Sequence, residues 1–223
     1  MYMACGEIIL VENIMNIVAI IPAYNEQETI GDVLSVLIKV KKLDKIIVVS
    51  DGSTDKTVNV AKKFDVEVIV LEENLGKGGA MKAGLTDMSA DVLLFLDADL
   101  IGLKVKHVYD LLEPVLKDEA DITIGIFEEG RIVTDLAQKI IPKLSGQRAL
   151  KAGILEGISD LEVTRFGVEV ALNNYIKKSK VRLKKVVLRN MSHVTKEEKL
   201  GFFKGVNARM KMYWEIVNYI AKK

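Results

Sequence analysis

The chain has 223 residues, of which 49% are hydrophobic, 6% aromatic and 28% charged, and its formal net charge at pH 7 is +1. This length suits one elaborated α/β domain better than two complete ones, and the composition excludes a disordered or fibrous protein. No uninterrupted apolar stretch reaches the roughly 20 residues that a membrane-spanning helix needs.

Residues 1–14 are expected to be an N-terminal extension, because the first strand pattern starts naturally from Met15. They lack the basic start, apolar centre and small-residue cleavage site of a signal peptide. Cys5 is the only cysteine, so the chain has no disulfide framework. Both features predict a reducing, cytoplasmic setting.

Five short, β-branched runs alternate with helical patterns and predict a mostly parallel sheet built from βαβ units. The runs are 17–21, 46–49, 66–70, 92–96 and 122–126. A helix between the first two is expected to start at a capping box of Asn25 and Glu28 and to bury one apolar stripe. Three further helices are expected, one after 53–55, one at 77–88 and one at 104–116.

The alternation ends at residue 127, and residues 127–194 are expected to form a smaller acceptor-side region of the same domain. Helices near 135–143 and 167–178 and a strand at 183–188 are predicted there. Residues 195–223 predict a C-terminal amphipathic helix. Residues 177–223 hold fourteen Lys or Arg against three Asp or Glu. This basic C-terminal segment allows two interpretations: a solvated helix, or a segment that contacts phosphate or an anionic surface.

Polar residues follow the first four strands, at 22–26, 50–55, 74–79 and 97–99. In an open parallel sheet, ligands bind at the carboxyl ends of the strands, so these four loops are expected to meet at one edge. The sequence therefore predicts one ligand site there.

Asp97 and Asp99 follow a run too apolar to be anything but a buried strand, so their negative charges need compensation. A divalent cation, Mg²⁺ or Mn²⁺, held by carboxylates and by the phosphates of a bound nucleotide would supply it. The alternative is a polar strand end that caps the next helix.

Residues 76–79 place Lys77 among glycines at a predicted helix start, where free N–H groups and the helix dipole attract phosphate. The segment is not a Walker motif, and Met81 stands where a dinucleotide fingerprint has its last glycine. A simple turn is the alternative.

Together the four loops resemble, in order and spacing, the family-2 glycosyltransferases, and the resemblance covers residues 17–100. It implies the GT-A fold, a single Rossmann-like nucleotide-binding domain with its core at 15–126. It also implies a set of residues that bind the nucleotide-sugar donor: Pro22, Ala23, Tyr24, Glu26, Asp51, Ser53, Lys77, Asp97, Ala98 and Asp99.

Three later segments, at 130–134, 145–148 and 166–169, are similar to parts of the glucosyl-3-phosphoglycerate synthases. That resemblance implies acceptor binding by Arg131, Val133, Thr134 and Gly146. It implies a catalytic or sugar-contacting Glu169 alongside Asp99, and a metal site of Asp99 and His193. The chain departs from that family at Met191, where the family keeps an arginine. Each role has a plainer alternative: a solvated arginine, a glutamate at a helix start, a loop histidine.

The function expected from these residues is metal-dependent transfer of a sugar, glucose from UDP-glucose first, to a small anionic acceptor such as 3-phosphoglycerate. One alternative is a polyprenyl-phosphate glycosyltransferase that binds the membrane surface through the C-terminal helix. Another is a nucleotide-sugar-binding protein without turnover. No nucleic-acid partner is expected, and peripheral membrane contact and a homodimer stay open.

Overall fold

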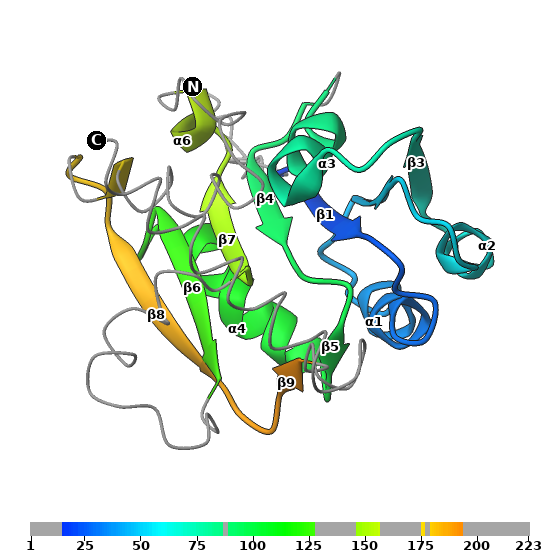
Figure 1. Ribbon diagram of the computed structural model, residues 1–223. Helices are drawn as coiled ribbons and strands as arrows, with labels where there is room; N and C mark the ends of the chain where they lie inside the picture. Colours follow the sequence, from blue (N-terminus) through cyan, green and yellow to red (C-terminus); the bar gives the residue numbers. More distant parts are fainter. Residues whose placement is uncertain (1–14, 87–88, 128–145, 157–174, 177–178, 194–223) are drawn as a thin grey trace, which may run out of the picture.

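The computed structural model describes residues 15–86, 89–127, 146–156, 175–176 and 179–193. A seven-stranded sheet runs through the molecule in the order β3-β2-β1-β4-β7-β6-β8 (Figure 1). Its strands are β1 (Ile17–Ala23), β2 (Lys45–Asp51), β3 (Glu67–Leu71), β4 (Val92–Phe95), β6 (Ile122–Phe127), β7 (Arg148–Lys151) and β8 (Leu183–Leu188). Only β7 runs against its neighbours, because it pairs antiparallel with both β4 and β6.

Helices cover both faces of the sheet. They are α1 (Ile30–Leu37), α2 (Thr57–Ala61), α3 (Gly76–Gly84), α4 (Val105–Leu116) and the short α6 (Gly153–Glu156). The side chains of α1 and α4 enter one apolar cluster and those of α3 enter the other. Successive residues of β1 alternate between the two clusters. A strand covered on both sides is a continuous apolar run, which is why the sequence pattern was clear.

The five predicted βαβ strands and the strand at 183–188 are confirmed, with ends that differ by a few residues at most. The helices expected at 104–116 and after 53–55 are also present. The helix expected at 77–88 is α3, which ends at Gly84. An additional two-stranded sheet joins β5 (Leu100–Ile101) to β9 (Ser192–His193). β5, β7, β9 and α6 were not predicted.

The prediction of a helix-capping box at Asn25 and Glu28 is wrong. Helix α1 begins only at Ile30, its N-cap is Thr29, and the Thr29 side chain makes no capping hydrogen bond to the helix. Asn25 has a positive φ of 54°, and its Oδ1 accepts a hydrogen bond from the Thr54 N–H at 2.9 Å. The asparagine therefore closes a loop contact instead of starting a helix.

Several predictions fall outside the described residues: the extension at 1–14, the helix near 135–143 and the C-terminal helix at 195–223. Of the helix expected at 167–178, the structure describes Tyr175 and Ile176, which are helical. Within the described part of the chain, no helix is long and apolar enough to cross a membrane.

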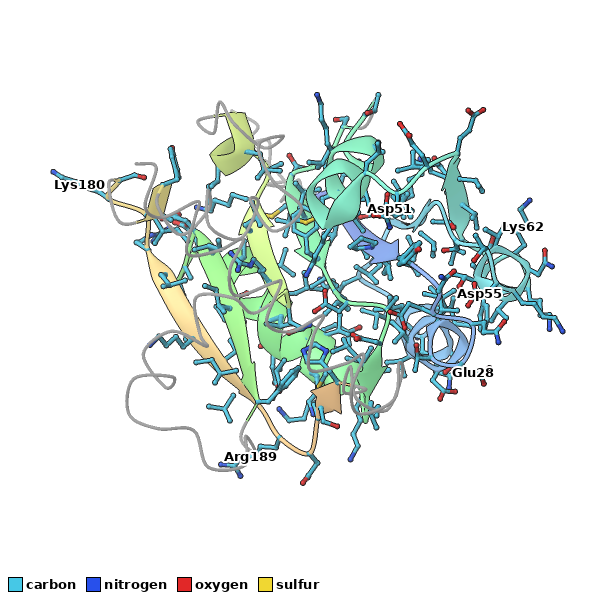
Figure 2. The ribbon with its side chains drawn as sticks, viewed as in Figure 1. Glu28, Asp51, Asp55, Lys62, Lys180 and Arg189 are labelled. Atoms are coloured by element: carbon cyan, nitrogen blue, oxygen red, sulfur yellow. The ribbon has the colours of Figure 1, made fainter. Side chains whose placement is uncertain are left out.

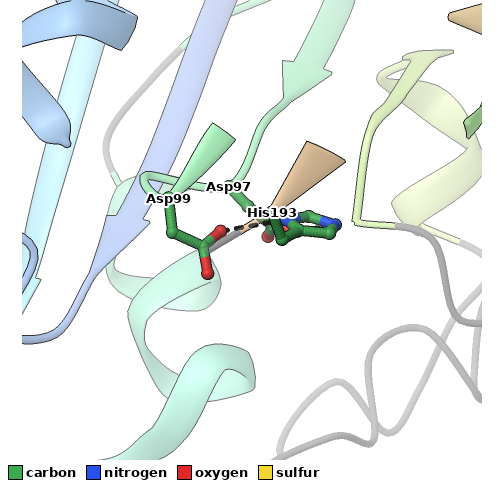
Figure 3. Close-up of side chains that lie close together, drawn as sticks. All are labelled: Asp97, Asp99 and His193. Atoms are coloured by element: carbon green, nitrogen blue, oxygen red, sulfur yellow. Dashed lines mark hydrogen bonds and ion pairs between the residues drawn. The ribbon is translucent and has the colours of Figure 1, made fainter. Parts of the chain in front are cut away.

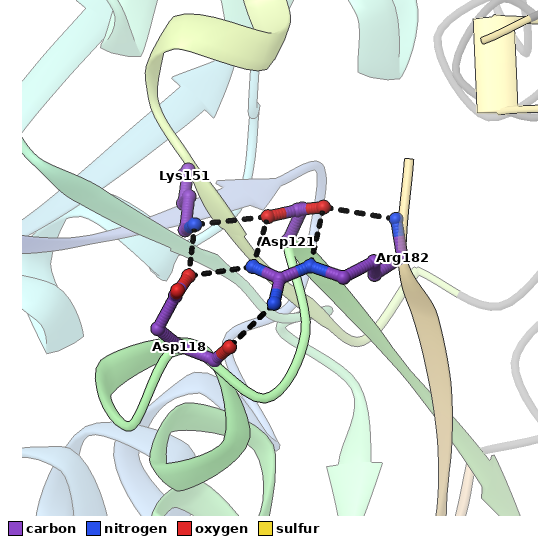
Figure 4. A network of polar contacts seen from close by, with 4 residues as sticks. All are labelled: Asp118, Asp121, Lys151 and Arg182. Atoms are coloured by element: carbon purple, nitrogen blue, oxygen red, sulfur yellow. Dashed lines mark hydrogen bonds and ion pairs between the residues drawn. The ribbon is translucent and has the colours of Figure 1, made fainter. Parts of the chain in front are cut away.

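Ion pairs join the turn before β6 to β7 and to the start of β8, at the amino end of β6 (Figure 4). Asp121 accepts hydrogen bonds from Lys151 Nζ at 2.9 Å and from Arg182 Nη2 at 2.8 Å. Asp118 Oδ1 forms ion pairs with the same two side chains, at 2.5 Å from Lys151 Nζ and 2.5 Å from Arg182 Nη2. We call these four residues the β6–β8 ion network; it lies at the edge opposite the polar loops.

Candidate functional site

The loops after β1 and β2 are held together by hydrogen bonds between them. Ser53 Oγ accepts the Asn25 N–H at 3.1 Å, and Thr57 Oγ1 accepts the Glu26 N–H at 2.8 Å. Asp55 Oδ2 accepts the Gln27 N–H at 3.1 Å, and Figure 2 shows Asp55 between α1 and α2. Ser53 and the 22–26 segment therefore form one surface held by hydrogen bonds, and Ser53, Pro22, Ala23, Tyr24 and Glu26 are the residues in it that were predicted to bind the donor.

Asp51 ties the end of β2 to the start of α3. Its side chain is buried, and Oδ1 accepts the Leu75 N–H at 2.7 Å. Gly52 follows with a φ of +66°, and a Cβ there would lie 2.7 Å from the backbone of Glu73 and Asn74. Only glycine fits this approach. The loops after β2 and β3 thus meet at the same edge, as predicted.

Two large apolar side chains stay open at this edge. Tyr24 and Leu75 are each 49% exposed, at the end of β1 and at the N-cap of α3. They offer exposed apolar surface near Asp51, whose carboxylate accepts the Leu75 N–H. Pro22 is partly buried and Ala23 fully buried within β1.

Asp97, Asp99 and His193 converge into one cluster, with one potential ligand atom from each lying within 4.8 Å of the others (Figure 3). The aspartates follow β4, whereas His193 comes from β9. The pairing of Leu100 with His193 across β5 and β9 brings the histidine back, 94 residues after Asp99. Ala98, between the aspartates, is 3% exposed and packs into the core, which orients its neighbours.

Asp97 has a partner on each carboxylate oxygen. Lys77 Nζ lies 2.5 Å from Oδ1, and Gln147 Nε2 donates to Oδ2 at 2.7 Å. Burial raises the pKa of Asp97, but the charges of Lys77 and His193 outweigh that effect and hold the pKa below its usual range. Asp97 is therefore a carboxylate at neutral pH.

His193 faces both aspartates. Its Nδ1 lies 3.0 Å from Asp99 Oδ1, and its Nε2 lies 4.0 Å from Asp97 Oδ2. The ring stands edge-on to Phe127, with centroids 4.8 Å apart. Burial lowers the pKa of His193, but the hydrogen bond to Asp99 and the two carboxylate charges raise it above its usual value. Proton and cation would compete for this imidazole.

Two carboxylates and an imidazole suit a divalent cation such as Mg²⁺ or Mn²⁺, which prefer oxygen ligands and accept nitrogen. This set of two carboxylates and one imidazole fits the predicted cation. Asp99 and His193 are the pair that the sequence assigned to it, and the fold brings them within direct contact.

Gly146, predicted to contact the acceptor, lies against the Lys77–Asp97 pair. A Cβ at this position would be 2.5 Å from both carboxylate oxygens of Asp97 and closer still to Lys77 Nζ. The missing side chain leaves room for the ion pair, so Gly146 belongs to the same site.

The sequence did not indicate Gln147 or Phe127. Gln147 is fully buried and directly follows Gly146, but no sequence signal shows that its amide reaches Asp97. The remaining predicted residues Arg131, Val133, Thr134 and Glu169 lie outside the described residues.

Comparisons with solved structures give the same fold. Glucosyl-3-phosphoglycerate synthase from Mycobacterium tuberculosis, in a complex with Mn²⁺, UDP and glucosyl-3-phosphoglycerate, is 26% identical, with a TM-score of 0.69 over 81% of this chain and 72% of that one. The same enzyme with Mg²⁺ and UDP has a TM-score of 0.67.

Sequence comparisons give shorter matches. A dolichyl-phosphate beta-glucosyltransferase of Drosophila melanogaster is 38% identical over 117 residues, which is 45% of this chain and 35% of that protein. A poly-beta-1,6-N-acetyl-D-glucosamine synthase of Staphylococcus aureus is 38% identical over 96 residues, 41% of this chain and 23% of that protein. The matched segments thus span about a third or less of these relatives.

The sequence model of glycosyl transferase family 2 matches residues 18–179, well over half of the chain. This range includes all four polar loops, and with them Asp97 and Asp99 of the cluster, while His193 lies beyond it. The chain therefore belongs to glycosyl transferase family 2 and has the GT-A fold.

Proposed function

We propose that this protein transfers glucose from UDP-glucose to a small anionic acceptor such as 3-phosphoglycerate, with Mg²⁺ or Mn²⁺ as cofactor. The convergence of Asp97, Asp99 and His193 beside Lys77 carries the proposal. A carboxylate-rich cation site next to a lysine at a helix start suits a nucleotide diphosphate. The solved relatives that bind Mn²⁺ or Mg²⁺ with UDP support it.

The donor's base and ribose would lie on the braced loops after β1 and β2. Asp51 would accept a hydrogen bond from the base, and Tyr24 would supply an apolar surface. The other residues proposed for this part of the donor site are Pro22, Ala23, Glu26 and Ser53. The tight contacts between the two loops keep this surface in place before the donor binds, which lowers the ordering cost of binding.

Asp99 and His193 would hold the cation, and Asp97 would hold the ribose. The bound cation would act as a Lewis acid that stabilises the departing diphosphate. Lys77 would contact the phosphates, because its ammonium lies at the start of α3.

The acceptor would meet Arg131, Val133 and Thr134 from one segment and Gly146 from another, with Glu169 near the transferred sugar. A planar guanidinium suits a carboxylate or phosphate on the acceptor. Of these residues, Gly146 is the one that the structure describes, and its position beside Asp97 supports an acceptor region next to the donor region.

A screen of donors and acceptors with Mg²⁺ and Mn²⁺, read by NMR of the product, tests this proposal. We expect transfer from UDP-glucose to 3-phosphoglycerate, loss of transfer with chelator, and loss of transfer in Asp99→Asn with the fold kept. Full activity of Asp99→Asn would remove this carboxylate from the site. Nucleotide binding without transfer to any acceptor would favour a binding protein.

The similarity to a dolichyl-phosphate beta-glucosyltransferase favours a second candidate, in which the acceptor is a polyprenyl phosphate. Both candidates use a phosphorylated acceptor, so the screen includes a short polyprenyl phosphate in detergent and flotation with anionic vesicles. Transfer to the lipid together with vesicle binding would select this candidate over the small acceptor.

A further inference from the structure

The side-chain atoms that could bind a cation already make hydrogen bonds or ion pairs with other side chains of the protein. Lys77 Nζ lies 2.5 Å from Asp97 Oδ1, and Gln147 holds the other oxygen at 2.7 Å. Asp99 and His193 hold each other at 3.0 Å. The positive charge of Lys77 thus lies against Asp97, next to the proposed cation ligands Asp99 and His193, on a side chain that is 22% exposed.

The ammonium of Lys77 and a divalent ion bound at this cluster would repel each other, because both are positively charged. Two positive charges a few ångströms apart are unfavourable even in water, and the partly buried site weakens screening by salt. Asp97 cannot give full compensation to a divalent ion while its charge is shared with Lys77. The cluster therefore favours the divalent ion only if the ammonium moves away or finds another anion.

We propose that Lys77 is an internal counter-cation that opposes metal binding until the diphosphate of the donor draws its ammonium away from Asp97. Lys77 is the second residue of α3, so its side chain starts beside the helix end where a phosphate is stabilised. A diphosphate there gives the ammonium a new partner and adds ligands for the metal. Metal and nucleotide then bind cooperatively, and this inference rests on the proposed donor site.

Gly146 and Gln147 permit and support the pair. The lack of a side chain at Gly146 leaves room for it, because any Cβ there would collide with Lys77 and Asp97. Gln147 donates from a neutral amide, so it holds Asp97 without adding charge. Its contact also shows that this carboxylate accepts an amide donor, which makes Lys77→Gln a conservative way to remove the charge alone.

The test measures Mn²⁺ affinity by the EPR signal of free Mn²⁺, with and without UDP, in the full chain. In the wild type, UDP should raise Mn²⁺ affinity by roughly tenfold or more, and Mn²⁺ should raise UDP affinity by the same factor. In Lys77→Gln, Mn²⁺ alone should bind about tenfold more tightly, the effect of removing one nearby positive charge. The enhancement by UDP should shrink in that variant.

Two matched variants isolate the charge at this position. Lys77→Arg keeps the charge and should keep weak Mn²⁺ binding without UDP. Lys151→Gln removes an equal charge from the β6–β8 ion network and should leave Mn²⁺ affinity unchanged, with or without UDP. Thermal melts of each variant establish that the fold is intact.

The outcomes separate this inference from the proposed function. If UDP promotes Mn²⁺ binding in the wild type but Lys77→Gln gains no affinity for Mn²⁺ alone, the counter-cation role is wrong and the donor site stands. An equal gain in Lys77→Arg would also overturn it, because the charge would not be the cause. If the wild type binds no Mn²⁺ with UDP present, the metal-dependent function itself fails.

Discussion

At the scale of single residues, the site depends on one position without a side chain. Gly146 lies where a methyl group would collide with Asp97 and Lys77, so the ion pair requires a glycine here. A neutral, flexible neighbour could give way to a new methyl group. Here the neighbours are the Lys77 ammonium and a partly buried carboxylate held from two sides, and that carboxylate cannot move without losing a hydrogen bond.

We therefore expect Gly146→Ala to displace Asp97, the residue proposed to hold the ribose, and to weaken UDP binding in the presence of Mn²⁺ by roughly tenfold, about 1.4 kcal/mol. Isothermal titration of UDP with Mn²⁺ measures this. Gly153→Ala is the matched control, because nothing lies within 4 Å of a Cβ at that position. Unchanged UDP affinity in Gly146→Ala would mean that the position of Asp97 plays no part in donor binding.

At the scale of elements, the cluster of Asp97, Asp99 and His193 depends on the contacts that fix the turn between β8 and β9 to the rest of the fold. His107 is buried in the first turn of α4, where its Nδ1 accepts the Lys104 N–H at 3.2 Å. Its ring also bonds to the backbone of Arg189, the residue after β8. Gly102, with a φ of +76°, packs against the Asn190 carbonyl. These contacts hold the turn that leads to His193.

Replacing His107 by Phe should remove both hydrogen bonds and lower the free energy of unfolding by about 1–3 kcal/mol. It should also weaken Mn²⁺ binding in the presence of UDP, because the turn that carries His193 loses an attachment. Thr123→Val is the control: the Thr123 hydroxyl donates to the Leu111 carbonyl and accepts the Ala149 N–H, away from β9. Equal stability losses with equal Mn²⁺ affinities would refute a positioning role for His107.

The β6–β8 ion network acts at the opposite edge and concerns stability. Hydrogen bonds from Arg182 and Lys151 hold the pKa of Asp121 well below its usual range. A carboxyl group with a lowered folded-state pKa stabilises the fold above its unfolded-state pKa of about 4, and the contribution is lost as the pH falls below that value.

Asp121→Asn should therefore reduce stability at pH 7 by about 1–2 kcal/mol, since it weakens several charge-assisted hydrogen bonds at once. The difference from the wild type should narrow as the pH is lowered from about 5 toward about 2. Urea titrations at several pH values measure both effects. Glu113→Gln, which breaks an exposed pair with Lys117 on α4, should change little and serves as the control.

At the scale of the whole molecule, donor, cation and fold should be linked thermodynamically. The diphosphate and the carboxylates of Asp97 and Asp99 repel each other without a cation, so UDP alone should raise the melting temperature little. With Mg²⁺ or Mn²⁺ added, UDP at about 100 times its dissociation constant should stabilise the protein by roughly 2.7 kcal/mol. Differential scanning fluorimetry with and without chelator measures this, and equal shifts in both conditions would exclude the metal.

Several predictions about the whole molecule stay predictions. The division of the chain at residues 14, 126 and 194, the cytoplasmic setting and a homodimer belong to this group. So does contact between the C-terminal helix and a membrane, which the flotation experiment addresses.

Local sequence patterns were enough to predict the parallel strands and the polar residues at their carboxyl ends. The reason is that β1, β2 and β4 are buried on both faces, so each is a continuous apolar run, and the residues after each run must lie at one edge. Asp51, Lys77, Asp97 and Asp99 could therefore be assigned to one site from the sequence alone. Their resemblance to a family then indicated the chemistry.

The distant residues that complete the site are brought there by strand pairing. β7 contains the buried Arg148 and lies between β4 and β6, which no local pattern of alternation indicates. That pairing carries Gln147 to Asp97, 50 residues away in the chain, as the two-residue pairing of β5 with β9 carries His193 to Asp99. Contacts of this kind depend on how strands pair across the whole fold, so the residues of one short segment do not specify which distant segment will lie beside them.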